Sequence, residues 1–509
     1  MILKVPLGFL ARYGILFGFI LSLFILGFIF LERIELISSY NADLGGTEPN
    51  IIYGIQRLMD DQTLYSDPNQ PPYAIITYSP LYFHICATIG NAFDLDQNEP
   101  IEIYRLSRAI SLLFNLGLTV FVFLIAYRIF NLSWMVSVIS AIMSFLYLRI
   151  TEFSRVDSLY HLILIGCIYL LLEYSICNNK KRGLQLLGVA SALGMLSLFA
   201  KQSGLILLVL MVFFLIYTRD DLKNILFSLL TMLGSFLLFL LLFSQGSFYD
   251  FFQNTYNGVD NGVSIGDWFY RRILLFYARE INFFTAFVLA LASFLLIDFK
   301  DKKNILLGLG IWATFSFGLL TTFKWGSMPS YFTPFICLGF IAISYFLTDI
   351  LTNRYNVPKN FLHLFLLGIV IFCGFTELPK KLKDFRHEKN DKVYEEAREV
   401  YTYLNDTLNI QKDEWVFNLI AGQMFQDRTF LNNFLYRNAL LPSKDIVTCC
   451  AYRLKSYDYN DLKAGADNGL IKYLIKKRAS NLDSYFDMKF TRFHLVKEFN
   501  NYSLYQYSE

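Results

Sequence analysis

The chain has 509 residues, of which 55% are hydrophobic and only 17% are charged, and its formal net charge is +3. A soluble domain usually carries about 25% charged residues, so this chain has an excess of apolar surface that must face lipid. The small net charge argues against a nucleic-acid partner, and no His or Cys spacing typical of a metal site occurs. The composition therefore predicts an integral membrane protein.

Apolar stretches follow one another through residues 1–378, and crossing a bilayer takes about 20 such residues. A further apolar stretch, 78–93, is expected to lie as a half-helix or interfacial helix in the first outer loop, 32–105. Residues 1–378 are thus expected to form an all-α transmembrane domain. About eleven spanning helices are predicted, at 13–31, 106–129, 133–150, 157–176, 185–199, 203–217, 224–243, 276–297, 304–321, 331–349 and 361–378.

Lys and Arg in the short loops predict the orientation, because cytoplasmic loops are enriched in both. Lys4 and Arg12 precede the first helix, which favours a cytoplasmic N-terminus. The first apolar run is too long for a signal peptide and is expected to remain as a span. The low charge and plain N-terminus favour a bacterial plasma membrane over a eukaryotic endoplasmic reticulum. Four later basic loops share the face of the N-terminus if the helices alternate: 180–182, 219–223, 300–303 and 354–359.

Residues 379–509 differ sharply in composition and are expected to form a small soluble α/β domain on the extracytoplasmic side. Segment 386–404 is rich in Glu, Lys and Arg, which predicts an exposed helix. EWVFNLIA (414–421) and KYLIKK (472–477) predict strands. FHLVKEFNNYSLYQY (493–507) predicts a hairpin around its Asn-Asn pair.

The first outer loop carries acidic residues beside a turn. Asp43 follows the first span, and Gly45, Gly46 and Pro49 make the backbone between Asp43 and Glu48 turn-like. A carboxylate in such a place can act as a general base toward a hydroxyl. The alternative is a solvated loop with incidental acids, since outer loops normally carry them.

Charged and polar residues recur at the predicted helix tips on the same face as this loop. A charge at membrane depth is costly, so it usually faces a cavity and marks a site. Three cations that converge beside acids fit an anionic headgroup, and a lipid phosphate is the natural candidate. The alternative is that each cation reaches out to the interface on its own. The residues at these tips are Arg155, Asp157, Lys201, Gln202, Lys324 and Tyr331.

The order of these motifs resembles the GT-C glycosyltransferases, in particular family-39-like members related to protein O-mannosyltransferases and lipid A aminoarabinose transferases. The resemblance runs through residues 1–380. It implies a polyprenyl-phosphate sugar as donor and a lipid, a glycan or a protein as acceptor. Besides Asp43, the matching segments are LMDDQTLYSDP (58–68), ITYSPLYF (76–83), YRLSRAIS (104–111), RVDSLY (155–160), AKQSG (200–204) and FKWGSMPSYFTP (323–334).

The resemblance also implies a catalytic carboxylate in the first outer loop, and Asp43 is the position that matches. Many family members have a paired acidic motif there, whereas this chain has Asn-Ala-Asp with Glu48 as the next acid. It therefore stays open whether Asp43 acts alone or with Glu48.

The chemistry needs few groups, because a sugar phosphate already has a good leaving group. Asp43 would take the proton of the acceptor hydroxyl, and attack opposite the phosphate predicts inversion. Positioned cations would stabilise the departing phosphate. Arg155, Lys201, Lys324 and Tyr331 are the candidates for that role, and Asp157, Gln202 and Tyr78 are the candidates for contacts with the rest of the substrate.

No cofactor is required by this chemistry, although the acids could hold a divalent cation. A lipid or glycan transporter (a flippase) is the main alternative function. It would also need many helices and charges in a cavity, but the inverted repeats and broken helices common in transporters are not evident. A scaffold that works through its tail is a third possibility.

Overall fold

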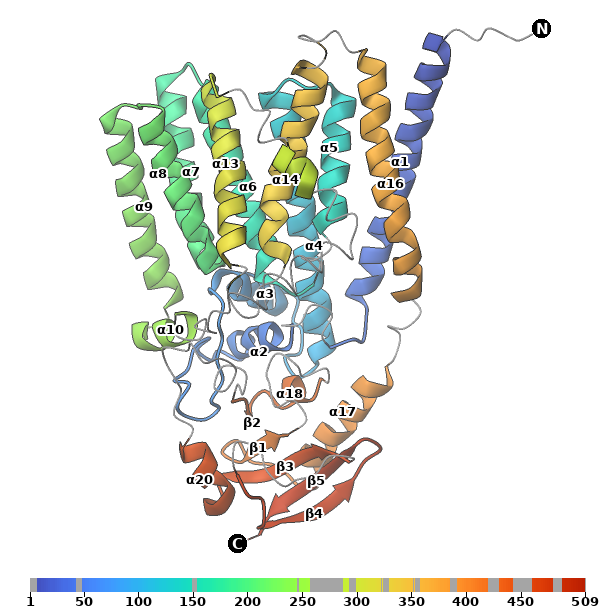
Figure 1. The fold of residues 1–509 in the computed structure, drawn as a ribbon. Helices are drawn as coiled ribbons and strands as arrows, with labels where there is room; N and C mark the ends of the chain where they lie inside the picture. The colour runs from blue at the N-terminus through green and yellow to red at the C-terminus, as the bar shows by residue number, and fades with distance from the viewer. Residues whose placement is uncertain are drawn as a thin grey trace, which may run out of the picture.

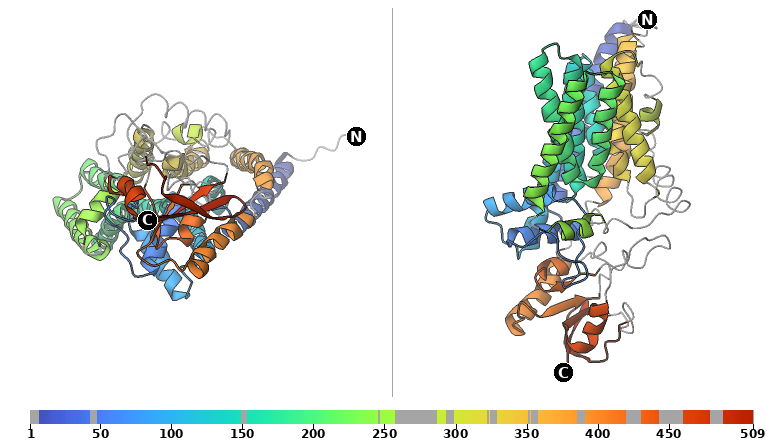
Figure 2. Two further views of the ribbon diagram at one scale, coloured as in Figure 1. Left: turned by 90° about the horizontal axis from the view of Figure 1, so that it is seen from below. Right: turned by 90° about the vertical axis from the view of Figure 1, so that its left-hand side faces the viewer.

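The computed structural model describes residues 7–42, 48–148, 153–244, 247–256, 287–292, 299–321, 323, 329–350, 352, 358–384, 391–419, 430–442, 460–478 and 488–508. The described chain forms three layers (Figure 1): a helical bundle, a middle layer of short helices, and a small sheet. The N-terminus lies at the far end of the bundle and the C-terminus at the sheet. A side view shows the same order of layers (Figure 2).

The bundle confirms the prediction of a polytopic α-helical membrane protein. Within the described residues, seven helices are long and apolar enough to cross a membrane, and three shorter apolar helices accompany them. The seven belong to α1 (Leu7–Ile37), α4 (Pro100–Leu124), α6 (Val156–Ile176), α7 (Lys180–Ala200), α9 (Leu222–Phe243), α13 (Lys302–Thr321) and α14 (Thr333–Tyr345) with its flanking turns, and the shorter apolar helices belong to α5 (Trp134–Tyr147), α8 (Leu205–Tyr217) and α16 (Lys359–Asp384), which is apolar over Lys359–Phe375.

Short turns of other helix types extend some of these helices. Two π-helical turns, Ile125–Ile129 and Phe346–Ile350, continue α4 and α14. Two 3₁₀ turns, Gln202–Gly204 and Pro329–Phe332, lead into α8 and α14. Most of the predicted span 276–297 lies outside the described residues, but 287–292 is helical, and Phe287 packs on Phe335 of α14 with 5.4 Å between ring centroids.

The apolar side chains of the bundle divide between core and surface. The α14 helix is buried on nearly every side, whereas α9 exposes a row of leucines that includes Leu230, Leu237 and Leu241. A helix that is apolar all round and exposed on one side belongs in lipid. The surface of α9 is therefore lipid-facing.

The middle layer lies across the end of the bundle (Figure 1) and consists of α2 (Glu48–Met59), α3 (Leu81–Ala92) and α10 (Phe248–Thr255). The twelve residues of α3 reach about 18 Å, too short for a hydrocarbon core of about 30 Å, so the stretch 78–93 does not span. The α2 helix begins where the sequence predicted only a turn. Pro49, its second residue, suits a helix start, because proline is tolerated in the first turn, where the N–H has no helical partner.

The sheet has five strands in the order β2-β1-β3-β5-β4. Strands β2 and β3 both pair with β1 in parallel, and the β4–β5 hairpin adds to β3 antiparallel. The predicted strands at 414–421 and 472–477 and the hairpin at 493–507 are confirmed, as is a helix within 386–404. The strands are β1 (Trp415–Asn418), β2 (Ala439–Leu440), β3 (Ile471–Lys477), β4 (Phe493–Glu498) and β5 (Tyr502–Tyr507), with helices α17 (Lys392–Thr402), its π-helical end Tyr403–Thr407, α18 (Leu431–Phe434) and α20 (Asn460–Asn468).

The sheet layer docks on the middle layer through a buried amide network. Asn433 Nδ2 donates to the carbonyl of Pro49 (3.0 Å) and to Gln56 Oε1 (3.2 Å), and Gln56 Nε2 donates back to the carbonyl of Asn433 (2.8 Å). Arg437 adds an ion pair to Asp60, with Nη2 2.6 Å from Oδ1. The C-terminal sheet therefore lies on the same side of the membrane as the first outer loop.

Candidate functional site

The structure brings together Arg155, Asp157 and Lys201 at the end of the bundle that faces the middle layer. Lys201 Nζ lies 2.7 Å from Asp157 Oδ1, and Arg155 Nε lies 3.2 Å from Asp157 Oδ2. Arg155 precedes α6, Asp157 is in its first turn, and Lys201 joins α7 to the 3₁₀ turn before α8. All three side chains are buried, so two cations share one carboxylate in a place with little access to water. We call these three residues the Asp157 cluster.

Glycine makes the tight connection that places Lys201. A Cβ atom on Gly204 would lie 2.3 Å from the carbonyl carbon of Ser197, so only glycine fits there. The chain can then turn back on α7 within a few residues. Lys201 lies at that turn, with its side chain toward Asp157.

Segments that are far away in sequence complete the surroundings of the Asp157 cluster. The ring centroid of Tyr331 lies 4.2 Å from Lys201 Nζ, and Ser330 Oγ donates to Asp157 Oδ1 at 3.3 Å. Tyr78 of the first outer loop is partly buried. Burial raises the pKa of Tyr78, and the charges of Arg155, Asp157 and Lys201 also act on it. The structure thus gathers residues from four of the predicted segments.

Gln202 holds two of these segments together. Its Nε2 donates to the carbonyl of Thr77 at 2.7 Å and to the carbonyl of Thr255 at 3.2 Å. The amide nitrogen is therefore engaged with backbone carbonyls, and it fixes the residue next to Tyr78 against the end of α10.

Glu48 lies in a separate buried ion pair. Its two carboxylate oxygens accept from Nε and Nη2 of Arg108 at 2.9 Å each, and Oε1 also accepts from the backbone N–H of Ser154 at 2.9 Å. Arg108 further donates to the carbonyl groups of Ser39 and Asn41, at 2.9 and 2.7 Å. We call this group the Arg108 clamp. Because Ser154 precedes Arg155, the clamp lies directly beside the Asp157 cluster.

The other two predicted site residues, Asp43 and Lys324, lie outside the described residues. The chain on each side of Asp43 is nevertheless fixed by one side chain, because Arg108 binds the carbonyl of Asn41 on one side and the carboxylate of Glu48 on the other. The Arg108 clamp therefore binds the described chain on both sides of the segment 43–47.

Sequence reasoning did not single out Arg108 or Ser330. Arg108 did carry a signal, since it is a charged residue inside a predicted span, and such residues usually have a buried partner. Tyr104, Arg108 and Ser111 share one face of α4 at helical spacing, and all three are buried. Ser330 carries no comparable signal.

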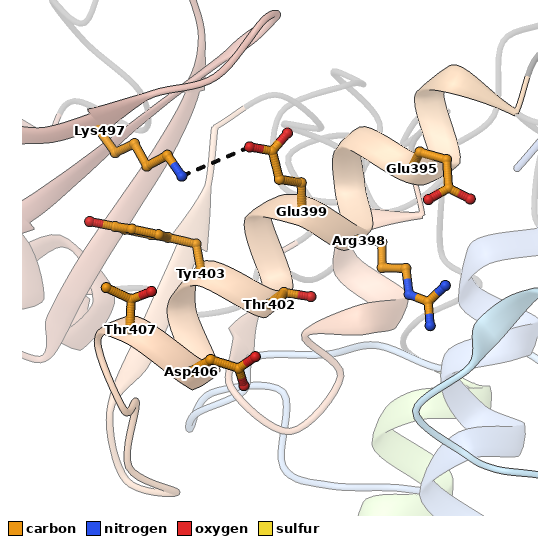
Figure 3. Close-up of a pocket in the computed structure, with 8 residues that line it drawn as sticks. All are labelled: Glu395, Arg398, Glu399, Thr402, Tyr403, Asp406, Thr407 and Lys497. Carbon is orange, nitrogen blue, oxygen red and sulfur yellow. Dashed lines mark ion pairs between the residues drawn. The ribbon is translucent and has the colours of Figure 1, made fainter.

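The structure also contains a hollow of about 550 Å³ in the C-terminal region, between α17 and β4 (Figure 3). Lys497 reaches across it toward Glu399, with 3.8 Å between Nζ and Oε1. Exposed charged side chains of both signs line this hollow, as is usual for a solvated surface. It does not contain the Asp157 cluster. In the part of the chain that the structure describes, no group of three or more His, Cys, Asp or Glu residues could hold a metal ion.

Comparison of the sequence with protein-family models gives no match, and comparison with the sequences of curated proteins gives none either. The fold, in contrast, is similar to solved structures over nearly its full length. ArnT from Cupriavidus metallidurans, bound to undecaprenyl phosphate, has a TM-score of 0.60 at 11% identity, over 96% of this chain and 97% of that one.

Two further solved structures show the same likeness. The oligosaccharyltransferase AglB from Archaeoglobus fulgidus, in complex with an inhibitory peptide and a dolichol-phosphate, has a TM-score of 0.56 at 13% identity, over 90% of this chain and 69% of that one. The mycobacterial arabinofuranosyltransferase AftD has a TM-score of 0.51 at 10% identity, over 98% of this chain and 40% of that one. The chain therefore has the fold of the GT-C glycosyltransferases, a polytopic helical bundle with a small C-terminal mixed sheet.

Proposed function

We propose that this protein is a membrane glycosyltransferase that moves a sugar from a polyprenyl-phosphate-linked donor to a hydroxyl group of an acceptor. The observation that carries the proposal is the Asp157 cluster, where Arg155 and Lys201 share one buried carboxylate at the end of the helical bundle that faces the middle layer. Two structures with this fold hold undecaprenyl phosphate and dolichol-phosphate. A lipid phosphate is thus the anion that best fits these cations.

The cations would act on the leaving group. As the bond from the anomeric carbon to the phosphate oxygen breaks, negative charge grows on the phosphate, and Arg155 and Lys201 stabilise it. Lys324 is the third cation expected from the sequence, and Tyr331 lies over Lys201. Asp157 keeps the two described cations charged and oriented before the substrate binds.

Asp43 would be the general base. It takes the proton of the acceptor hydroxyl as that oxygen attacks from the side opposite the phosphate, which inverts the anomeric centre. Glu48 acts in this scheme through the Arg108 clamp, because its two oxygens hold Arg108 and the backbone of Ser154. The clamp positions the loop of Asp43 on one side and Arg155 on the other.

We propose that the reaction takes place on the extracytoplasmic face of a bacterial plasma membrane. The basic segment 180–182, which is expected in the cytoplasm, begins α7 at the end of the bundle opposite to the Asp157 cluster (Figure 1). The C-terminal sheet shares the side of the Asp157 cluster. An acceptor that is a lipid, a glycan or a protein would reach the site from that side.

Sugar transfer by the purified protein in nanodiscs tests the proposal. A panel of polyprenyl-phosphate sugars is offered with wild type, Asp43→Asn and Asp94→Asn. Asp94 is an exposed acid of the same outer loop whose left-handed backbone (φ 50°) also suits Asn, so it is a matched control. Wild type and Asp94→Asn are expected to release polyprenyl phosphate, and Asp43→Asn is expected not to.

Other outcomes separate the parts of the proposal. If all three proteins release polyprenyl phosphate equally, the protein is a transferase but Asp43 is not its base. If none of them consumes a donor, while donor lipid moves across the bilayer of proteoliposomes that contain wild type, the protein is a transporter.

A further inference from the structure

The α10 helix has two chemically different faces. Phe248, Tyr249 and Phe252 are 45%, 59% and 55% exposed. Phe252 follows Phe248 by four residues and Tyr249 by three, so the three side chains are neighbours on one face of the helix. Asn254 is buried on the opposite side. A soluble surface rarely exposes three neighbouring aromatic side chains without a reason.

The position of α10 is tied to the membrane boundary. It begins five residues after the end of α9, a spanning helix, so its start lies at most about 18 Å from the end of that span. Figure 1 shows α10 crosswise at the foot of α9. The exposed leucines of α9 continue toward it, including Leu241, which is 72% exposed, and Leu242. The aromatic face of α10 therefore adjoins a surface that faces lipid.

We propose that α10 is an interfacial anchor, with Phe248, Tyr249 and Phe252 seated among the headgroups and upper acyl chains of the leaflet next to the site. Phe and Tyr fit this occupant, because aromatic side chains concentrate at the boundary between lipid and water, and an amphipathic helix lies there with its apolar face buried. The proposal needs only that the chain spans a membrane and does not depend on the proposed function.

The buried face of α10 connects this anchor to the first outer loop. Asn254 Oδ1 accepts from the backbone N–H of Ile76 at 2.9 Å, and its Nδ2 donates to the carbonyl of Ser66 at 2.8 Å. The carbonyl of Thr255 accepts from Gln202. The segment between Ser66 and Tyr78 is thus held against α10, and Asn254 is a positioning residue for it. Lipid that seats α10 fixes the segment that brings Tyr78 to the Asp157 cluster.

Tryptophan fluorescence in nanodiscs tests the anchor. Phe252→Trp and Leu495→Trp each add one indole to the five tryptophans of the wild type, whose emission is subtracted. Leu495 is the matched control, since it is an apolar residue with 48% exposure in β4, at the far end of the sheet layer (Figure 1). Phospholipids with brominated upper acyl positions are expected to quench most of the added emission of Phe252→Trp and none of that of Leu495→Trp.

Equal quenching of the two variants, or quenching of Phe252→Trp by aqueous iodide as strong as that of Leu495→Trp, would overturn the proposal. Tyr249→Trp, on the same face, provides a second reporter if Phe252→Trp does not fold. Each reporter that folds must respond to the brominated lipid for the anchor to stand.

Discussion

The Arg108 clamp and the Asp157 cluster are adjacent buried ionic groups that differ, among the residues the structure describes, in the ratio of cations to carboxylates. In the clamp one guanidinium faces one carboxylate in a two-bonded fork, and its remaining donors meet backbone carbonyls. In the Asp157 cluster two cations share one carboxylate. One guanidinium and one carboxylate neutralise each other, whereas two cations around one carboxylate can bind a further anion.

This difference separates structural from functional buried charges. The clamp joins the end of α1, the start of α2 and the segment before α6, so its loss should lower the stability of the fold. The Asp157 cluster lies at the proposed phosphate position, so its loss should lower the rate of sugar transfer. Substitutions in the two groups therefore give opposite patterns of stability and activity.

The largest effect on stability is expected for Arg108→Leu. It leaves the buried carboxylate of Glu48 without its partner, which typically costs about 3–5 kcal/mol. Thermal unfolding of the purified protein in detergent measures the loss. The double variant Glu48→Leu/Arg108→Leu should recover part of it, because no buried charge is left. A double variant less stable than Arg108→Leu would show that the clamp is not a self-contained pair.

The largest effect on activity is expected for Lys201→Gln. Removal of one donor to a developing negative charge typically costs a factor of about 10²–10³ in rate. Asp157 keeps Arg155, so the unfolding temperature should fall less than in Arg108→Leu. Release of polyprenyl phosphate gives the loss of rate, and thermal unfolding of the same preparations gives the loss of stability. Lys201→Arg, which keeps the charge, should retain more activity. Equal losses of stability in Lys201→Gln and Arg108→Leu would remove the distinction between the two groups.

The contact between the sheet layer and the middle layer is expected to contribute less to stability than the Arg108 clamp. Asn433→Ala removes the buried donor to Gln56 Oε1 and to the carbonyl of Pro49 and should cost about 1–3 kcal/mol. Hydrogen exchange of α2 and α18 should rise in this variant. Asn438→Ala is the control, since its amide bonds only carbonyls of the C-terminal region, those of Gln411 and Glu414. If exchange in α2 rises equally in both variants, Asn433 is not the docking contact.

The smallest effect is expected for Arg437→Ala, because its ion pair with Asp60 is partly exposed, with side chains 37% and 20% exposed. Such pairs contribute about 0–1 kcal/mol. The hydrogen bond from Arg437 holds the pKa of Asp60 below its usual value. The contribution is therefore present at neutral pH and is lost as the pH falls below about 4. Wild type and Arg437→Ala should differ slightly in unfolding temperature at pH 7, and this difference should shrink as the pH is lowered below about 4. A difference in unfolding temperature that grows at low pH would contradict this prediction.

The spans were predictable because lipid imposes a simple requirement, a long apolar run, on each of them. Arg155, Asp157 and Lys201 were predictable as one group for a related reason. Charged residues at the ends of spans are rare, so these three stand out in the sequence. Because successive helices run in alternating directions, all three are expected at the same face of the membrane. The strands at 414–421 and 472–477 follow from their β-branched and aromatic residues.

The partners of buried polar groups were not predictable. Glu48 and Arg108 are sixty residues apart, and nothing in either segment identifies the other. The α2 helix carries polar residues such as Asn50 and Gln56 that are buried against distant segments. Its sequence pattern therefore predicts neither a spanning helix nor a surface helix. Asn433 likewise gives no local signal, because its role depends on a surface formed by residues at the other end of the chain.

The contact between Asn433 and Gln56 joins positions 377 residues apart. During synthesis α2 emerges early, whereas its partner arrives only after every helix of the bundle has been made. The middle layer therefore receives this contact only after the segment that carries Asn433 has crossed to the same side. A nascent chain that stalls before residue 433 would have its membrane helices but an incomplete middle layer. The order of synthesis thus makes the completion of an early segment depend on a late one.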